Sequence, residues 1–136
     1  MKALALAVAL TALACRKPAP PPAAIHIPDA VAAARAAGKR ILITVDGDDC
    51  PKCKAFAAVY ERRPALAVLR DANFVALTSR GAVDKLPAPG ELPYLYVLDV
   101  NGTLIDAEPA TKLEKDGAYD LDKVEFFLKA FGPPKK

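Results

Sequence analysis

Two cysteines separated by two residues, Cys50 and Cys53, are the residues whose type and spacing point most directly to chemistry. They follow an apolar, β-branched run at 41–45, and a helix-compatible stretch begins directly after the first cysteine. If a helix starts there, Cys50 lies at its N-terminus, where unpaired backbone N–H groups and the helix dipole favour thiolate over thiol. Because the thiolate is the form that attacks disulfides, the spacing predicts a redox pair, with Cys50 as nucleophile and Cys53 as resolving thiol.

The residues around the pair support this prediction. Pro51 suits the first helical position, because its missing N–H would be unpaired there in any case. The ammonium of Lys52 lies between the two thiols in sequence and should favour the thiolate, whereas Asp48 and Asp49 should oppose it. Exposed charges are screened and each effect is small, so we expect the helix terminus to dominate. The pKa of the Cys50 thiol is then expected below its free value of about 8.5.

The elements that must position the pair alternate along the chain. Hydrophobic periodicity and turn residues predict helices over 31–37, 51–62 and 65–70, strands over 40–45, 73–78, 94–98 and 103–105, and a last helix from 121. Asp29 and Asp120 are expected to cap the first and last helices, and Asn101-Gly102 to turn between the last two strands. Segments 79–92 and 106–119 are expected to be loops. This order predicts an α/β fold with a central mixed sheet flanked by helices.

The apolar aromatic residues are assigned to the core of this fold. The helical spacing and strand positions place all the phenylalanines there: Phe56, Phe74, Phe126, Phe127 and Phe131.

Three stretches together resemble a known family: KRILITVDGDDCPKCKAF, then NFVALTS, then ELPYLYVLDVNGTLI. They resemble the thioredoxin fold, and most nearly the compact thioredoxin-like domains of bacterial envelope proteins, over roughly residues 28–131. The resemblance implies that Pro93 is a cis-proline beside the active-site disulfide and that Leu92 presents its backbone to the substrate chain. It also implies a thiol–disulfide oxidoreductase that acts on protein thiols and disulfides together with a redox partner protein. No organic cofactor is implied, because the cysteine pair is itself the redox group.

One departure from the family bears on mechanism. Many thioredoxins carry a buried acid six residues before the first cysteine, where this chain has Thr44. In the family that acid is thought to assist proton transfer from the second thiol, here Cys53. Water, Asp46, Asp48 or Asp49 could serve instead, and the spacing alone does not choose among them.

The N-terminal region predicts export. Residues 1–14 carry one lysine and then an unbroken run of apolar and small residues, which is typical of a signal peptide. Cys15 follows directly and resembles the lipidated first residue of bacterial lipoproteins; plain secretion with a free Cys15 is the alternative. We expect a Pro-rich tether over 15–27, one domain over 28–132 and a flexible tail over 133–136, in the periplasm or cell envelope.

Net charge argues against a nucleic-acid partner. The chain has 19 Lys and Arg against 16 acidic residues, and losing residues 1–14 would leave a net charge of about +2, too small for a nucleic-acid surface.

Four other interpretations of the cysteine pair need to be considered. A structural zinc site needs about four ligands, and the chain offers no second cysteine pair and only one histidine, so no metal site is assigned. Soft-metal handling, such as copper, is an alternative for two thiols. So short a disulfide loop removes little unfolded-chain entropy, which argues against an inert staple. The remaining alternative is a thioredoxin-like binding module that performs no exchange.

Overall fold

The computed structural model describes residues 24–135. The predicted signal peptide, Cys15 and the first part of the predicted tether lie outside the described residues. Over 24–135, no helix combines the length and apolar character needed to cross a membrane.

The described chain alternates helices and strands. In order the elements are α1 (Ile27–Ala37), β1 (Arg40–Asp46), α2 (Pro51–Arg62), α3 (Pro64–Asn73), β2 (Phe74–Arg80), β3 (Tyr94–Leu98), β4 (Leu104–Pro109), a 3-10 helix η1 (Ala110–Leu113), β5 (Glu114–Lys115), β6 (Ala118–Tyr119) and α4 (Leu121–Ala130). The main sheet has the order β2-β1-β3-β4. β1 pairs parallel with β2 and antiparallel with β3, and β3 pairs antiparallel with β4. The predicted α/β fold with a mixed sheet is confirmed.

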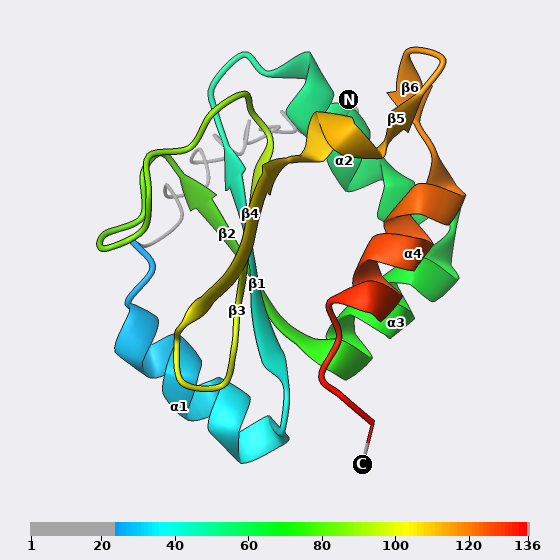
Figure 1. Ribbon diagram of the computed structural model, residues 1–136. Coiled ribbons are helices and arrows are strands. Elements are labelled where there is room, and N and C mark those ends of the chain that lie inside the picture. The colour runs from blue at the N-terminus through cyan, green and yellow to red at the C-terminus, as the bar shows by residue number, and fades with distance from the viewer. Residues whose placement is uncertain (1–23, 136) are drawn as a thin grey trace, which may run out of the picture.

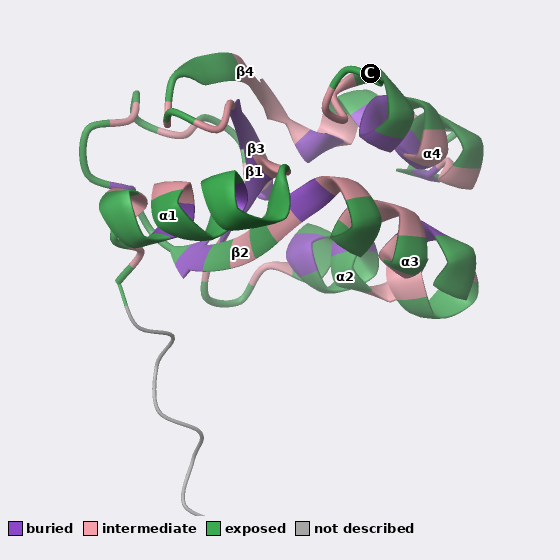
Figure 2. Cartoon of the chain, turned by 90° about the horizontal axis from the view of Figure 1, so that it is seen from below, coloured by how far each residue is buried: buried purple, intermediate pink, exposed green. Residues whose placement is uncertain are grey.

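The sheet separates two hydrophobic cores. α1 covers one face, and α2, α3 and α4 cover the other (Figure 1). Alternate residues of β1 serve the two sides, because successive side chains of a strand point to opposite faces. Ile41 and Ile43 belong to the α1 core, whereas Leu42 belongs to the core beneath α2 and α4. Figure 2 shows buried residues gathered on the central strands and on the inner sides of the helices.

The first helix corrects one prediction. Asp29 was expected to be its N-cap, but α1 begins at Ile27 and His26 occupies the cap position without a side-chain capping bond. The fixed φ of Pro28 suits a first helical turn, so the helix starts before Asp29. The Asp29 carboxylate instead lies 3.1 Å from Nδ1 of His26. Gly38 ends the helix as predicted, with a left-handed φ of 66°.

Helix α3 and strand β2 differ from the predicted boundaries. The helix was expected to end near Arg70 and the strand to start at Asn73, but Asn73 is the last residue of α3. Its side-chain amide donates to the carbonyl of Leu69 at 2.8 Å, and the N–H of Phe74 donates to the carbonyl of Arg70. These bonds extend the helix from its predicted end near Arg70 to Asn73.

The segment after the hairpin turn is more ordered than predicted. β4 continues to Pro109 instead of ending at Ile105, and the predicted loop at 106–119 contains the end of β4, η1 and the small β5–β6 hairpin. β4 is an edge strand with half-buried polar residues, so it lacks the apolar alternation that identifies a strand from sequence.

The last helix confirms one prediction and overturns another. Oδ1 of Asp120 accepts from the backbone N–H groups of Asp122 and Lys123 at 2.9 and 3.0 Å, as expected for an N-cap. Phe126, however, is 74% exposed, so its assignment to the core is wrong. Helical spacing directs Val124, Phe127 and Leu128 inward and leaves position 126 on the outer face.

Candidate thiol–disulfide site

The cysteine pair lies at the start of α2 and is joined by a disulfide. The S–S distance is 2.06 Å and the two Cα atoms lie 5.2 Å apart. Cys50 is the N-cap in an extended conformation, and Pro51 is the first helical residue as predicted. Sγ of Cys50 accepts the backbone N–H of Cys53 at 3.1 Å. The same N–H also donates to the carbonyl of Cys50 at 3.1 Å. One sulfur therefore lies against a backbone donor of the helix terminus, where negative charge is stabilised.

The two sulfurs differ in access. Cys50 is partly exposed, whereas Cys53 is 6% exposed. A hollow of about 280 Å³ beside them is lined by both cysteines and by the loop from β1. An incoming thiol or disulfide therefore meets Cys50 more readily than Cys53, as the predicted order of attack requires.

The segment before β3 lies against the loop that carries Cys50. The Leu92–Pro93 peptide bond is cis, as predicted. Tyr94, the next residue, pairs with Val45 near the end of β1. Pro93 therefore lies at the same end of the strands as the loop that carries Cys50. A Cβ on Gly47 would come within 2.7 Å of Cδ1 of Leu92. Gly47 thus permits this close approach. The sequence predicted only a turn at this glycine and did not indicate its contact with Leu92.

Lys52 makes contacts that the sequence did not indicate. Its Nζ lies 3.1 Å from Oε1 of Glu91 and 3.6 Å from Oε1 of Glu114. The hydrogen bond to Glu91 and the charge of Glu114 raise the pKa of the exposed Lys52 ammonium. The ammonium therefore links the start of α2 to the loop before Pro93 and to β5, and its charge is shared with two carboxylates.

Comparisons with known proteins agree with this geometry. Residues 23–85, which include both cysteines, match the sequence model of a family described as thioredoxin-like. The described residues adopt a thioredoxin-like fold. Among solved structures, the chain resembles a disulphide isomerase from Xylella fastidiosa Temecula1 (TM-score 0.61, 16% identity, covering 76% of this chain and 86% of that one). It also resembles a thioredoxin from Thermus thermophilus (TM-score 0.52, 19% identity, 76% and 81% covered). No curated protein matches the sequence significantly.

The structure distinguishes the three acids that precede the cysteines. Oδ1 of Asp48 accepts from Arg80 at 2.6 Å, and Asp49 is exposed. Asp46 is partly buried and lines two hollows that Cys53 also lines. Burial raises the pKa of the Asp46 carboxyl, and the nearby Arg80 cation only partly opposes that effect. Asp46 is therefore the acid best placed and best tuned to hold a proton near Cys53.

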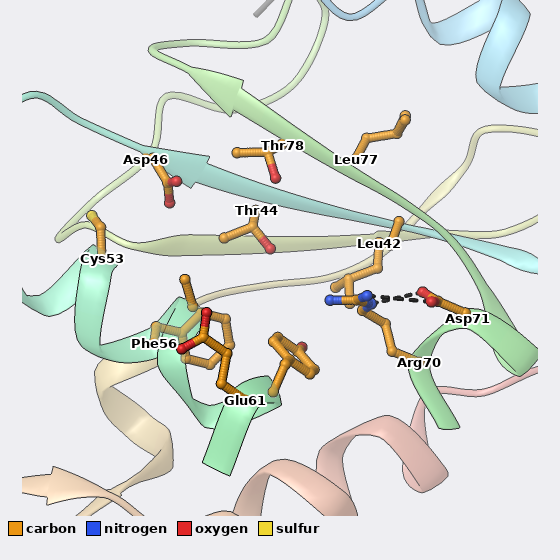
Figure 3. Close-up of a pocket in the computed structure, with 13 residues that line it drawn as sticks. Leu42, Thr44, Asp46, Cys53, Phe56, Glu61, Arg70, Asp71, Leu77 and Thr78 are labelled. Carbon is orange, nitrogen blue, oxygen red and sulfur yellow. Dashed lines mark hydrogen bonds and ion pairs between the residues drawn. The ribbon is translucent and has the colours of Figure 1, made fainter. Parts of the chain in front are cut away.

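The larger of the two hollows that Asp46 and Cys53 line lies between the sheet and helices α2 and α3. It has a volume of about 460 Å³. Figure 3 shows Asp46 and Cys53 at one end of it, with Thr44 and Thr78 along the sheet. Arg70 and Asp71 lie at the other end, paired at 2.8 Å. A solvent-accessible space thus begins beside the buried sulfur and continues along the sheet.

Proposed function

We propose that the chain is a thiol–disulfide oxidoreductase that acts on protein thiols and disulfides. The observation that carries the proposal is the position of Cys50, whose sulfur accepts a helix-terminal N–H while remaining partly exposed. The thioredoxin-like fold supports it, as does the match of residues 23–85 to a family described as thioredoxin-like. By this proposal Leu92 and Pro93 present backbone to the substrate chain.

In the reducing direction the steps are as follows. The Cys50 thiolate attacks one sulfur of a substrate disulfide, forms a mixed disulfide and releases the other substrate sulfur as a thiolate. Cys53 then loses its proton and attacks Sγ of Cys50, which releases the second substrate sulfur and leaves the Cys50–Cys53 disulfide. Two electrons pass from the dithiol to the substrate, and the reverse sequence oxidises a substrate dithiol.

We further propose that the chain is exported and held at a membrane of the cell envelope by a lipid on Cys15. The apolar run before Cys15 supports export, and a lipid anchor would explain the cysteine left outside the pair. A redox partner protein would then be needed to restore the pair after each turnover.

Insulin reduction and the refolding of a scrambled disulfide substrate test the central proposal. We expect the chain to accelerate at least one of these reactions well above the rate with glutathione alone. Inactivity in both assays, with both thiols accessible to alkylation after reduction, would favour the alternative of a thioredoxin-like binding module. Tight copper binding together with such inactivity would favour soft-metal handling.

Asp46 should act as the proton acceptor for Cys53. Its raised pKa makes its carboxylate a stronger base than an ordinary aspartate, and it lines the same hollows as the thiol. We expect Asp46→Asn to slow release of the mixed disulfide at pH 7 by on the order of 100-fold. The deficit should shrink at alkaline pH, where hydroxide can remove the thiol proton without Asp46. Stopped-flow measurement of this step across pH tests the prediction, with Asp48→Asn as the matched control.

Stability measurements show whether that variant is merely damaged. A carboxyl whose pKa is raised on folding binds its proton more tightly in the native state, so its contribution to stability falls as the pH rises through the raised pKa. The cost is fully present at pH 7, and Asp46→Asn should remove it. The variant should therefore be more stable than the parent at pH 7, and this gain should vanish below the ordinary pKa of 3.8. A loss of stability at pH 7 would contradict the environment assigned to Asp46.

A further inference from the structure

Within residues 24–135, strand β2 forms one of the two edges of the main sheet. β2 lies at the end of the strand order, and within residues 24–135 it pairs only with β1. Natural edge strands are protected from pairing by lysines, prolines, bulges or inward-pointing charges. Residues 74–79 of β2, FVALTS, contain none of these residue types, and the register with β1 is unbroken. The first charge is Arg80, at the end of the strand.

Hollows lie on both sides of this edge. The hollow of about 460 Å³ lies on the α2–α3 side and is lined in part by Ala76 and Thr78. A second hollow, of about 430 Å³, lies on the α1 side and is lined in part by Ile25, Val75 and Leu77. Figure 2 shows β2 between α1 and the α2–α3 pair. Because side chains alternate along a strand, an added strand would place successive side chains over the two hollows in turn.

The open edge leads to the disulfide. At the end of β2, Arg80 pairs with Asp48, and the N–H of Gly81 donates to the carbonyl of Asp46 at 3.4 Å. The hollow along β2 and the hollow beside Cys50 also share lining residues: Asp46, Cys53 and Ala57. A polypeptide bound along β2 could therefore extend directly into the space beside Cys50.

We propose that the open edge of β2 binds an extended segment of the substrate polypeptide by strand addition, with apolar side chains on the α1 side, while a neighbouring substrate cysteine reacts at Cys50. This inference rests on the proposed function and names its substrate class. Strand addition needs a segment whose backbone donors and acceptors are free, and an unfolded or locally unfolded protein supplies such segments, so we take this as the substrate class. Backbone hydrogen bonds supply affinity that depends little on sequence. The hollow on the α1 side, lined in part by Ile25, Val75 and Leu77, favours apolar side chains, whereas the hollow on the α2–α3 side also offers polar groups such as Thr78.

Matched peptides test strand addition directly. The probe is a synthetic peptide with alternating valine and threonine next to a cysteine held as its glutathione mixed disulfide. Its partner carries N-methyl groups on alternate residues, which removes backbone donors and keeps the side chains. We expect the reduced chain to react at least about tenfold faster with the unmethylated peptide, because several backbone hydrogen bonds are lost in its partner. Equal rates would overturn the proposal.

A pair of variants locates the effect. Ala76→Lys places a charge on the exposed edge, whereas Val68→Lys places one on the exposed surface of α3. Ala76→Lys should lower the peptide rate about tenfold and leave the rate with oxidised glutathione unchanged, and Val68→Lys should change neither. Loss of both rates in Ala76→Lys, or an unchanged peptide rate, would contradict the assignment. If the parent chain exchanges with oxidised glutathione but shows no preference for the unmethylated peptide, strand addition at β2 is wrong and the proposed function stands. If it exchanges with neither glutathione nor the peptides, strand addition and the proposed function both fail.

Hydrogen exchange identifies the occupant. In a Cys53→Ser chain trapped with the peptide, the β2 amides that do not donate to β1 should exchange more slowly than in the same chain trapped with glutathione. If these amides are already protected in the free chain, the edge is occupied and the proposal is overturned. Protection that disappears on dilution would then identify a second copy, and protection independent of concentration would identify residues 1–23 of the chain.

Discussion

Replacing Cys50 with serine is expected to reduce disulfide exchange to the uncatalysed rate. The hydroxyl of serine cannot form a disulfide, so neither the mixed disulfide nor the internal Cys50–Cys53 bond can form. Insulin reduction or scrambled-substrate refolding measures the loss. The variant should remain folded, because the N-cap position accepts serine and its oxygen can accept the Cys53 N–H that sulfur accepts now.

Cys53→Ser is the informative partner of that variant. With the resolving thiol removed, the mixed disulfide at Cys50 persists, and the substrate should remain covalently attached under non-reducing conditions. Non-reducing electrophoresis and mass spectrometry detect the trapped species. If Cys50→Ser trapped substrate and Cys53→Ser did not, the two roles would be reversed.

Truncating Phe56 is expected to have the largest effect on stability. Its ring is 4% exposed and packs edge-on against Tyr119 at 5.1 Å and Tyr60 at 6.1 Å. Phe56 lies one turn beyond Cys53, so it fixes the start of α2 against the sheet and the β5–β6 hairpin. Phe56→Ala should lower the free energy of unfolding by about 3–5 kcal/mol, through lost burial and the cavity left behind.

Phe126→Ala is the matched control. The same chemical change at a residue that is 74% exposed should alter the free energy of unfolding by no more than about 0.5 kcal/mol. Urea denaturation of both variants in the oxidised state measures the difference. Similar losses in the two variants would contradict the packing described for both helices.

Local signals explain why the reactive end of the molecule was predictable from sequence. The apolar run before Cys50, the proline after it and the spacing to Cys53 each act within a few residues, and they place the thiol at a helix start. Gly38 and Asp120 likewise end and begin helices through bonds to neighbouring backbone. The family resemblance added the cis Leu92–Pro93 bond, which periodicity alone does not reveal.

The mistaken and missing predictions involve competing or distant partners. Asp29 is a good capping residue, but Pro28 suits a first helical turn and allows the helix to begin before Asp29. Local sequence signals therefore allowed two possible starts for this helix. Phe126 is apolar, and only the orientation of α4 on the sheet determines that its side chain points to solvent. The partners of Lys52 and the burial of Asp46 depend on segments brought together by the sheet. Sequence spacing carries little information about such contacts.

The equilibrium of the cysteine pair with glutathione tests the central claim most directly. A thiolate stabilised at the start of α2 favours the reduced form, and partial exposure of Cys50 allows exchange. Alkylation and mass spectrometry across buffers of increasing reduced glutathione should show reversible conversion of disulfide to dithiol, with a midpoint potential above about −300 mV. A pair that stays oxidised in every buffer, with a potential below that value, would be a structural disulfide and would contradict the account.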